Sequence, residues 1–268
     1  MADVSAIPQI PPTPTPPTLV KICGLQSPEA ALVAAEAGAD FLGLIFVEGS
    51  RRAVSLAQAK SIIEAVRSRP VPASEPTRLP VSDSADWFTL QSTRLASHPR
   101  KPLFVGVFQN PSLSTLLSTI DELHLDVVQF HGDEPIEWAR LVGVPVIKAI
   151  HVDSKVEIEG QAALREATRP GYHSLSLLDT KVGSGKAALS GGAGKVFDWG
   201  VAHRLVESRA EGQGKLPILL AGGLDLENVD SCIEQAHPWA VDVSGGVETA
   251  GVKDADKIRA FISLVKGR

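Results

Sequence analysis

Residues able to do chemistry stand where short apolar segments of this chain end. A thiol, Cys23, closes the segment 18–23, and a carboxyl, Asp179, closes the segment 174–179. Arg52 follows a third apolar segment, and its planar guanidinium suits a carboxylate or a phosphate. We interpret the thiol and the carboxyl as candidates for catalysis and the arginine as a candidate for binding an anion. The alternatives are a buried structural thiol, a helix cap and a solvated surface arginine.

Glycine-rich turns supply the most specific local signal, and both lie near the C-terminal end of the chain. They consist of Gly222 and Gly223, and of Ser244, Gly245 and Gly246. Glycine lets the main chain approach an anion closely. Paired turns after the last strands of an α/β barrel often bind phosphate through main-chain N–H groups. We therefore predict a phosphate site here, against the alternative of ordinary turns.

Secondary structure must position these residues, and apolar runs alternate with helical patterns from residue 18 onward. The runs lack period-two alternation, as expected of strands buried on both faces of a parallel sheet. The predicted strands are 18–23, 40–46, 103–108, 127–131, 144–150, 174–179, 217–221 and 240–244. The predicted helices begin at Ser27 and Ser55 and continue with 112–123, 134–142, 154–167, 198–207, 225–235 and 254–265.

This alternation predicts a closed (β/α)₈ TIM barrel, a single catalytic domain over residues 18–268. The alternative is an open, doubly wound sheet, but Gly-x-Gly-x-x-Gly is absent after the first strand. In a barrel, catalytic groups gather at the C-terminal ends of the strands. Gln129, His131 and Lys148 then join Cys23 and Asp179 at one end.

Three segments break the rhythm of strands and helices. Residues 1–17 form a proline-rich leader, which we interpret as a tail or a tether to another domain. Residues 69–102 are rich in proline and fit no strand, so we predict a long loop insertion. Residues 180–196 are glycine-rich and follow the predicted strand 174–179, so we predict that they form a mobile loop at the candidate active site.

Composition and motifs exclude several classes of function. The 268 residues carry a net charge of −5, which argues against nucleic acid, and no apolar run is long enough to span a membrane. With only Cys23 and Cys232 there is no disulfide framework, so we expect a reducing, cytoplasmic setting. The lysine-bearing glycine runs of 183–195 do not complete a nucleotide-binding P-loop. His131 belongs to no standard metal-ligand spacing, and we expect no metal.

An ordered set of short motifs is similar to one enzyme family. The motifs are Lys21-Ile22-Cys23-Gly24, Ser50-Arg51-Arg52, Val128-Gln129-Phe130-His131-Gly132, Leu177-Leu178-Asp179-Thr180, Gly222-Gly223-Leu224 and Asp242-Val243-Ser244-Gly245-Gly246-Val247-Glu248. The chain resembles the phosphoribosylanthranilate isomerases of tryptophan biosynthesis over about residues 18–266. Its long loops and leader resemble fungal members, where this domain is often fused to other enzymes of tryptophan biosynthesis.

The resemblance implies an Amadori rearrangement of N-(5-phosphoribosyl)anthranilate to 1-(2-carboxyphenylamino)-1-deoxyribulose 5-phosphate, without a cofactor. It implies that Cys23 is the general base and Asp179 the general acid. It also implies that Arg52 holds the anthranilate carboxylate and that the glycine turns hold the phosphate, with Gln129 and His131 in the substrate pocket.

Other readings of the sequence remain open. Another phosphate-binding barrel, such as indole-3-glycerol-phosphate synthase or a sugar-phosphate isomerase, is the enzymatic alternative. The synthase would carry lysines and a glutamate at its strand ends rather than Cys23 and Asp179. A barrel that only binds a phosphorylated ligand or serves in assembly is the non-catalytic alternative.

Overall fold

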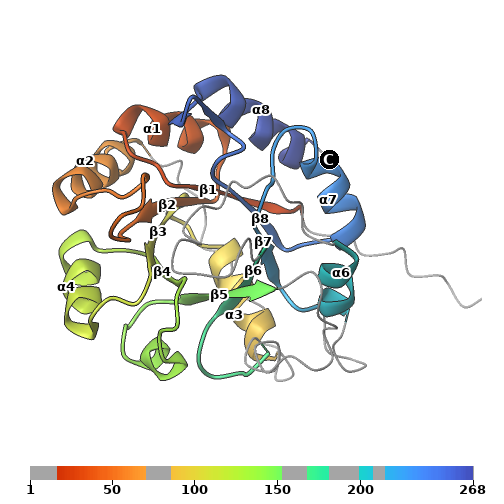
Figure 1. Ribbon diagram of the computed structural model, residues 1–268, viewed down its shortest axis with the longest axis horizontal. Coiled ribbons are helices and arrows are strands. Elements are labelled where there is room, and N and C mark those ends of the chain that lie inside the picture. Colours follow the sequence, from red (N-terminus) through yellow and green to blue (C-terminus); the bar gives the residue numbers. More distant parts are fainter. Residues whose placement is uncertain (1–16, 71–85, 153–167, 181–198, 208–214, 268) are drawn as a thin grey trace, which may run out of the picture.

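Eight parallel strands close into a barrel in chain order, with β8 pairing back onto β1 (Figure 1). The computed structural model describes residues 17–70, 86–152, 168–180, 199–207 and 215–267. The strands are β1 (Leu19–Cys23), β2 (Phe41–Ile45), β3 (Leu103–Phe108), β4 (Val127–Phe130), β5 (Val146–Val152), β6 (Leu175–Thr180), β7 (Ile218–Leu220) and β8 (Ala240–Val243). The closed parallel sheet confirms the predicted barrel and excludes the open doubly wound alternative for this chain.

Helices surround the barrel (Figure 1). They are α1 (Pro28–Ala37), α2 (Leu56–Arg67), α4 (Leu113–Leu123), α6 (Trp199–Glu207), α7 (Val229–Ala236) and α8 (Ala255–Lys266). A further helix, α3 (Trp87–Ala96), lies across one end of the barrel. None of these described helices is both long and apolar enough to cross a membrane. The predicted helix 154–167, the loop 180–196 and nearly all of the leader 1–17 lie outside the described residues.

Local sequence sets the helix ends. Ser55 accepts a hydrogen bond from the main-chain N–H of Gln58, and the Gln58 side chain accepts one from the main-chain N–H of Ser55. This capping box begins α2 at the residue where the sequence predicts a helix start. Gly38 ends α1 with a φ of 97°, a left-handed conformation that glycine adopts without strain.

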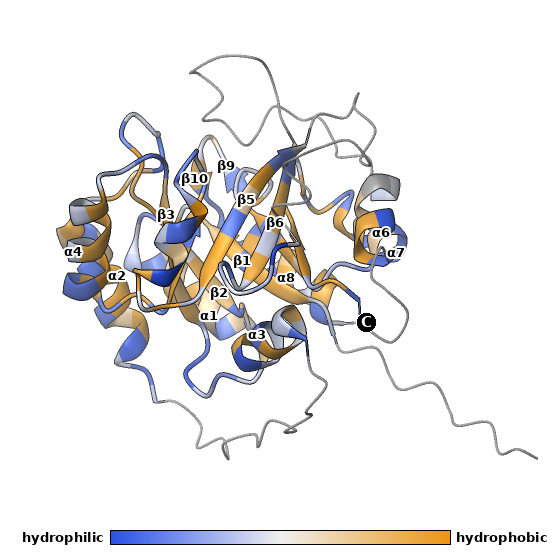
Figure 2. Ribbon diagram, turned by 90° about the horizontal axis from the view of Figure 1, so that it is seen from below, coloured by the Kyte–Doolittle hydropathy of each residue, from blue (hydrophilic) through white to orange (hydrophobic). Residues whose placement is uncertain are grey.

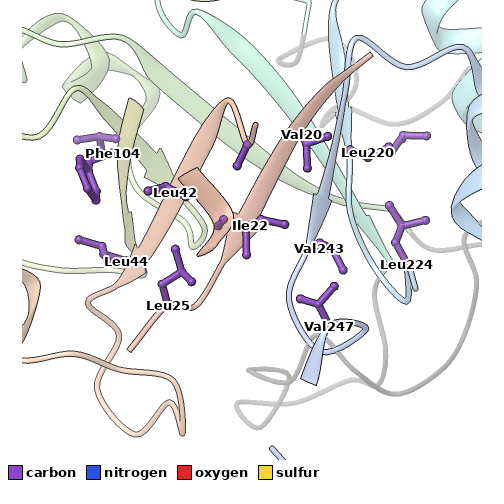
Figure 3. Packing of buried hydrophobic residues seen from close by; sticks show 14 of the residues in the cluster. Val20, Ile22, Leu25, Leu42, Leu44, Phe104, Leu220, Leu224, Val243 and Val247 are labelled. Atoms are coloured by element: carbon purple, nitrogen blue, oxygen red, sulfur yellow. The ribbon is translucent and has the colours of Figure 1, made fainter. Parts of the chain in front are cut away.

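Alternate residues of each strand face two different hydrophobic layers. On β1, Val20 and Ile22 point outward and pack in the layer between barrel and helices, with Leu42 and Val243 of the neighbouring strands (Figure 3). Leu19 packs in the layer inside the barrel. Because both layers are buried, the strands show no period-two pattern in sequence, as predicted.

The insertion 69–102 is not loop throughout, so that prediction is wrong in part. Residues 87–96 form α3, which Asp86 caps by accepting from the N–H groups of Phe88 and Thr89. Figure 2 shows α3 at one end of the barrel, and Leu95 packs there against the residues that begin the strands. Among these are Leu19, Phe41 and Leu103. The proline-rich and polar composition of residues 69–102 gives no sign of this helix or of the buried face, with Leu95, that closes this end of the barrel.

A second difference lies between β4 and β5. The predicted helix 134–142 is only a short 3₁₀ helix, η1 (Ile136–Arg140), with Pro135 before it and no side-chain cap.

A short antiparallel pair, β9 (Glu248–Thr249) and β10 (Val252–Lys253), was not predicted and follows β8. It lies at the opposite end of the barrel from α3 (Figure 2).

Truncating Leu95, which is 3% exposed, should open a cavity at the closed end of the barrel. We expect Leu95→Ala to lower the free energy of unfolding by about 2–5 kcal/mol. Urea unfolding followed by circular dichroism measures this loss. Arg94→Ala, on the exposed side of the same helix, should change it by less than about 0.5 kcal/mol. Equal effects of the two substitutions would contradict the packing role of α3.

Candidate active site

A cavity opens at the C-terminal ends of the strands, and every predicted site residue lines it. The predicted residues are Cys23, Arg52, Gln129, His131, Asp179, Gly222, Gly223, Ser244, Gly245 and Gly246. The empty space within it, counting the solvent at its open mouth, is about 810 Å³. Barrel closure therefore gathers residues that are more than 200 positions apart in sequence. Lys148 does not line the cavity; its ammonium donates to the carbonyl of Gly132 at 2.6 Å.

Cys23 ends β1 with its sulfur beside Gly43 of β2. A methyl group at position 43 would lie 2.8 Å from Cys23 Sγ, so glycine there makes room for the thiol. Burial raises the pKa of Cys23, while the nearby ammonium groups of Lys21 and Lys253 oppose that rise. The thiol is 7% exposed and unpaired with any other cysteine. The Asp242 carboxylate adds to the rise, so the pKa of Cys23 is raised overall, and the two ammonium groups are what stabilise the thiolate form that a base requires.

Asp179 ends β6 and approaches His131 of the loop after β4. His131 Nε2 lies 3.6 Å from Asp179 Oδ2. Burial, together with His151, Lys21 and Lys148, lowers the pKa of His131 to about 3, so the imidazole is neutral at physiological pH. The two groups are therefore not an ion pair. Leu177 and Leu178, the residues before Asp179, are fully buried.

The group formed by His131, His151 and Asp179 resembles a metal site only loosely. Their ligand-type atoms lie within 4.8 Å of one another. Zinc bonds of about 2.0–2.1 Å would need tetrahedral ligand atoms about 3.4 Å apart. The imidazole of His151 is also engaged, because its Nε2 lies 3.1 Å from the carbonyl oxygen of His131. Lys148 and Lys21 add positive charge at His131. The cluster therefore fits proton chemistry better than cation binding.

Arg52 is held by an internal carboxylate that the sequence analysis did not assign. Its Nε and Nη2 donate to Glu248 at 2.5 and 3.0 Å, and Lys253 donates to the same carboxylate at 2.8 Å. Burial opposes the ionisation of Glu248, but these bonds outweigh it and lower its pKa to about 2. The side-on pair fixes the plane of the guanidinium at the cavity wall. Glu248 is the last residue of the motif that begins at Asp242, but only the tertiary structure, with Glu248 at the start of β9, brings it to Arg52.

The two glycine turns contact each other at the rim of the cavity. Gly222 and Gly223 have φ angles of 88° and 69°, which residues with a Cβ rarely adopt. A methyl group at Gly246 would overlap the carbonyl oxygen of Leu224, because the turns are bridged at Asp225 and Gly246. The predicted phosphate site therefore depends on glycine at three of its positions.

Cys232, by contrast, belongs to the core, as its place in an apolar helical pattern predicts. It lies on the buried face of α7. Burial alone raises its pKa to about 12. Cys232 is therefore an unreactive thiol, whereas Cys23 lines the cavity.

Comparison with known proteins gives one consistent result. Residues 70–264 match the family described as N-(5′-phosphoribosyl)anthranilate (PRA) isomerase. An N-(5′-phosphoribosyl)anthranilate isomerase of Pseudomonas aeruginosa is 37% identical over 94% of this chain and 97% of its own length. A phosphoribosylanthranilate isomerase structure from Thermotoga maritima superposes with a TM-score of 0.67 at 32% identity, over 94% of this chain and all of that one.

Longer relatives carry the same region as one part. A multifunctional tryptophan biosynthesis protein of Phycomyces blakesleeanus is 46% identical over 92% of this chain, which spans about a third of that protein's length. The same holds for the relative from Schizosaccharomyces pombe, at 42% identity over 95% of this chain.

The ion network around Glu248 should make stability depend on acid. With a pKa of about 2 in the folded protein against an ordinary 4.5, Glu248 stabilises the fold fully above pH 4.5 and loses this contribution as the pH falls toward 2. Glu248→Gln should therefore flatten the decline of unfolding free energy below pH 4.5, measured by urea unfolding at several pH values. The exposed Glu36→Gln serves as control and should keep the wild-type slope. A Glu248→Gln curve parallel to wild type would contradict the network.

Proposed function

The chain belongs to the phosphoribosylanthranilate isomerase family, and we propose that its cavity converts N-(5′-phosphoribosyl)anthranilate to 1-(2-carboxyphenylamino)-1-deoxyribulose 5-phosphate. The single observation that carries this proposal is the meeting of Cys23, Asp179, Arg52 and both glycine turns around one cavity. An isomerase structure in complex with the reduced form of that product supports the choice of ligand.

The substrate has two anionic ends, and the cavity has two anion-binding regions. We assign the 5′-phosphate to the turns of Gly222–Gly223 and Ser244–Gly246 and the anthranilate carboxylate to Arg52. Glu248 holds the guanidinium through Nε and Nη2, so its orientation is set before substrate arrives. Holding both ends orients the sugar between the remaining groups, with Gln129 and His131 on the wall.

Two proton transfers then open and enolise the sugar. Asp179 protonates the ring oxygen, the C1′–O bond breaks, and the substrate nitrogen forms an iminium at C1′. Cys23, as thiolate, removes the proton from C2′ and the electrons flow into the iminium, leaving an enolamine. No cofactor enters these steps, because the substrate nitrogen is itself the electron sink. Neutral His131 supports Asp179 as the acid, since an imidazolium would instead favour its ionised form.

We also propose a cellular location for the chain and a role for its leader. Free thiols at Cys23 and Cys232 support a reducing, cytoplasmic location. The multifunctional relatives support the interpretation of the leader 1–17 as a link to a neighbouring domain of a longer polypeptide.

The reaction is tested by the loss of phosphoribosylanthranilate fluorescence, with the substrate generated in situ. The wild-type chain should consume it, and Cys23→Ala and Asp179→Asn should each lower kcat about 10²–10⁴-fold while folding normally by circular dichroism. Cys232→Ala serves as the thiol control and should retain wild-type kcat, since Cys232 lies outside the cavity. Near-normal turnover of Cys23→Ala or Asp179→Asn would remove that residue from the mechanism.

Arg52→Ala tests the carboxylate assignment in the same assay. We expect kcat/KM to fall about 10²-fold or more, chiefly through KM, because a charged contact to the substrate carboxylate is lost. Arg51→Ala is the matched control, since Arg51 is 62% exposed and also contacts Glu248 but does not line the cavity. An unchanged kcat/KM for Arg52→Ala would refute the assignment.

A further inference from the structure

One buried carboxylate on the cavity wall has no role in the steps above. Asp242 of β8 is 8% exposed and lines the cavity beside Cys23. Its Oδ2 accepts a hydrogen bond from Lys21 Nζ at 2.8 Å, whereas its Oδ1 makes no hydrogen bond within the described part of the chain. An unpartnered buried acceptor is costly, so its retention at a ligand cavity indicates a partner supplied by the ligand.

Lys21 keeps this carboxylate in place. The pairing of β1 with β8 puts Lys21 directly opposite Asp242, and the lysine side chain is fully buried. A buried ion pair adds little to stability compared with apolar residues of the same size. The fold therefore does not require two charges here, and their presence points to chemistry at Asp242 Oδ1.

The steps above do not assign an acceptor to one of the substrate's protons. After Cys23 has taken the C2′ proton, the enolamine still carries a hydroxyl on C2′, and the product carries a ketone there. Formation of the ketone requires loss of the O2′ proton and gain of a proton at C1′. The second transfer can come from Cys23, which by then is a thiol. The first needs another base close to Cys23.

We propose that Asp242 is a catalytic residue that accepts the O2′ proton on Oδ1 as the enolamine becomes the ketone. This inference rests on the proposed function. The substrate gains protons at the ring oxygen from Asp179 and at C1′ from Cys23, and loses them from C2′ to Cys23 and from O2′ to Asp242. The sum is an isomerisation without oxidant or reductant. One proton passes from Asp242 through solvent to Asp179 before the next cycle.

The placement of the charged groups favours Asp242 over its neighbours. Asp242 is on β8, and both Cys23 and Lys21 are on the adjoining strand β1. Asp179 belongs to β6, which does not adjoin β8. Gln129 Oε1 is also buried on the cavity wall and has no partner among the described residues, but an amide accepts a hydrogen bond without accepting a proton. Of these groups, only Asp242 can serve as a base beside Cys23 without being used in the ring-opening steps.

Asp242→Asn tests this role, because it preserves shape while removing the base. We expect kcat to fall about 10²–10³-fold with KM within about 3-fold of wild type. Enolisation should continue, so remaining substrate incubated in D₂O should gain deuterium at C2′ faster than product forms. Cys23→Ala should lose both exchange and turnover. Substrate exchange is followed by mass spectrometry, and folding by circular dichroism.

Asp40→Asn is the matched control for removing a buried, lysine-paired carboxylate. Asp40 is 5% exposed, contacts Lys101 and Lys266, and precedes β2 at the opposite end of the barrel. It should reduce stability and leave kcat unchanged. If Asp242→Asn does not fold, Asp242→Ser removes the base while keeping Lys21 beside Cys23, and it should show the same loss of kcat with exchange retained.

The outcomes separate this role from the proposed function. An inactive wild-type chain would contradict both. An active wild type with kcat within about 3-fold in a folded Asp242 variant would overturn the role of Asp242 alone. Loss of C2′ exchange together with turnover would also overturn it, because Asp242 would then act on the first proton transfer instead.

Discussion

The pairing of β8 with β1 is the constraint on which the site depends. It closes the barrel, sets Lys21 against Asp242, and brings the turn after β8 beside Cys23. Without this pairing the sheet would be open, and the first and last strands would be far apart. With it, the residues at all strand ends share one rim, and the proposed catalytic groups from β1 and β6 face the same space.

Charge at the rim is arranged so that buried groups compensate one another. The Glu248 carboxylate offsets one of the two positive charges of Arg52 and Lys253, and Asp242 pairs with Lys21. Each pair would be expensive if one partner were absent, because the other would stay buried and unpaired. This arrangement leaves neutral His131 beside Asp179 and positive charge beside Cys23. The proposed acid must hold a proton and the proposed base must lose one, and different neighbours within one cavity favour each state.

The two ends of the barrel serve different purposes. At the N-terminal end, α3 and the first residues of the strands form an apolar layer that resists water. At the C-terminal end, glycine turns and charged side chains replace that layer. Polar groups at this end that lack partners within the protein lower the stability of the fold, but they are available to bind an anionic ligand. Between the ends, fully buried strand residues pack closely together and support the rim (Figure 3).

The sequence by itself determined the strand–helix alternation, the capping box at Ser55 and the identity of the rim residues, because local patterns and chain order suffice for these. It could not reveal α3, since the packing of Leu95 against Leu19 and Phe41 is a long-range contact. It also could not assign Glu248 to Arg52 or Lys21 to Asp242. Those pairs are 196 and 221 residues apart, and only barrel closure decides which charges meet.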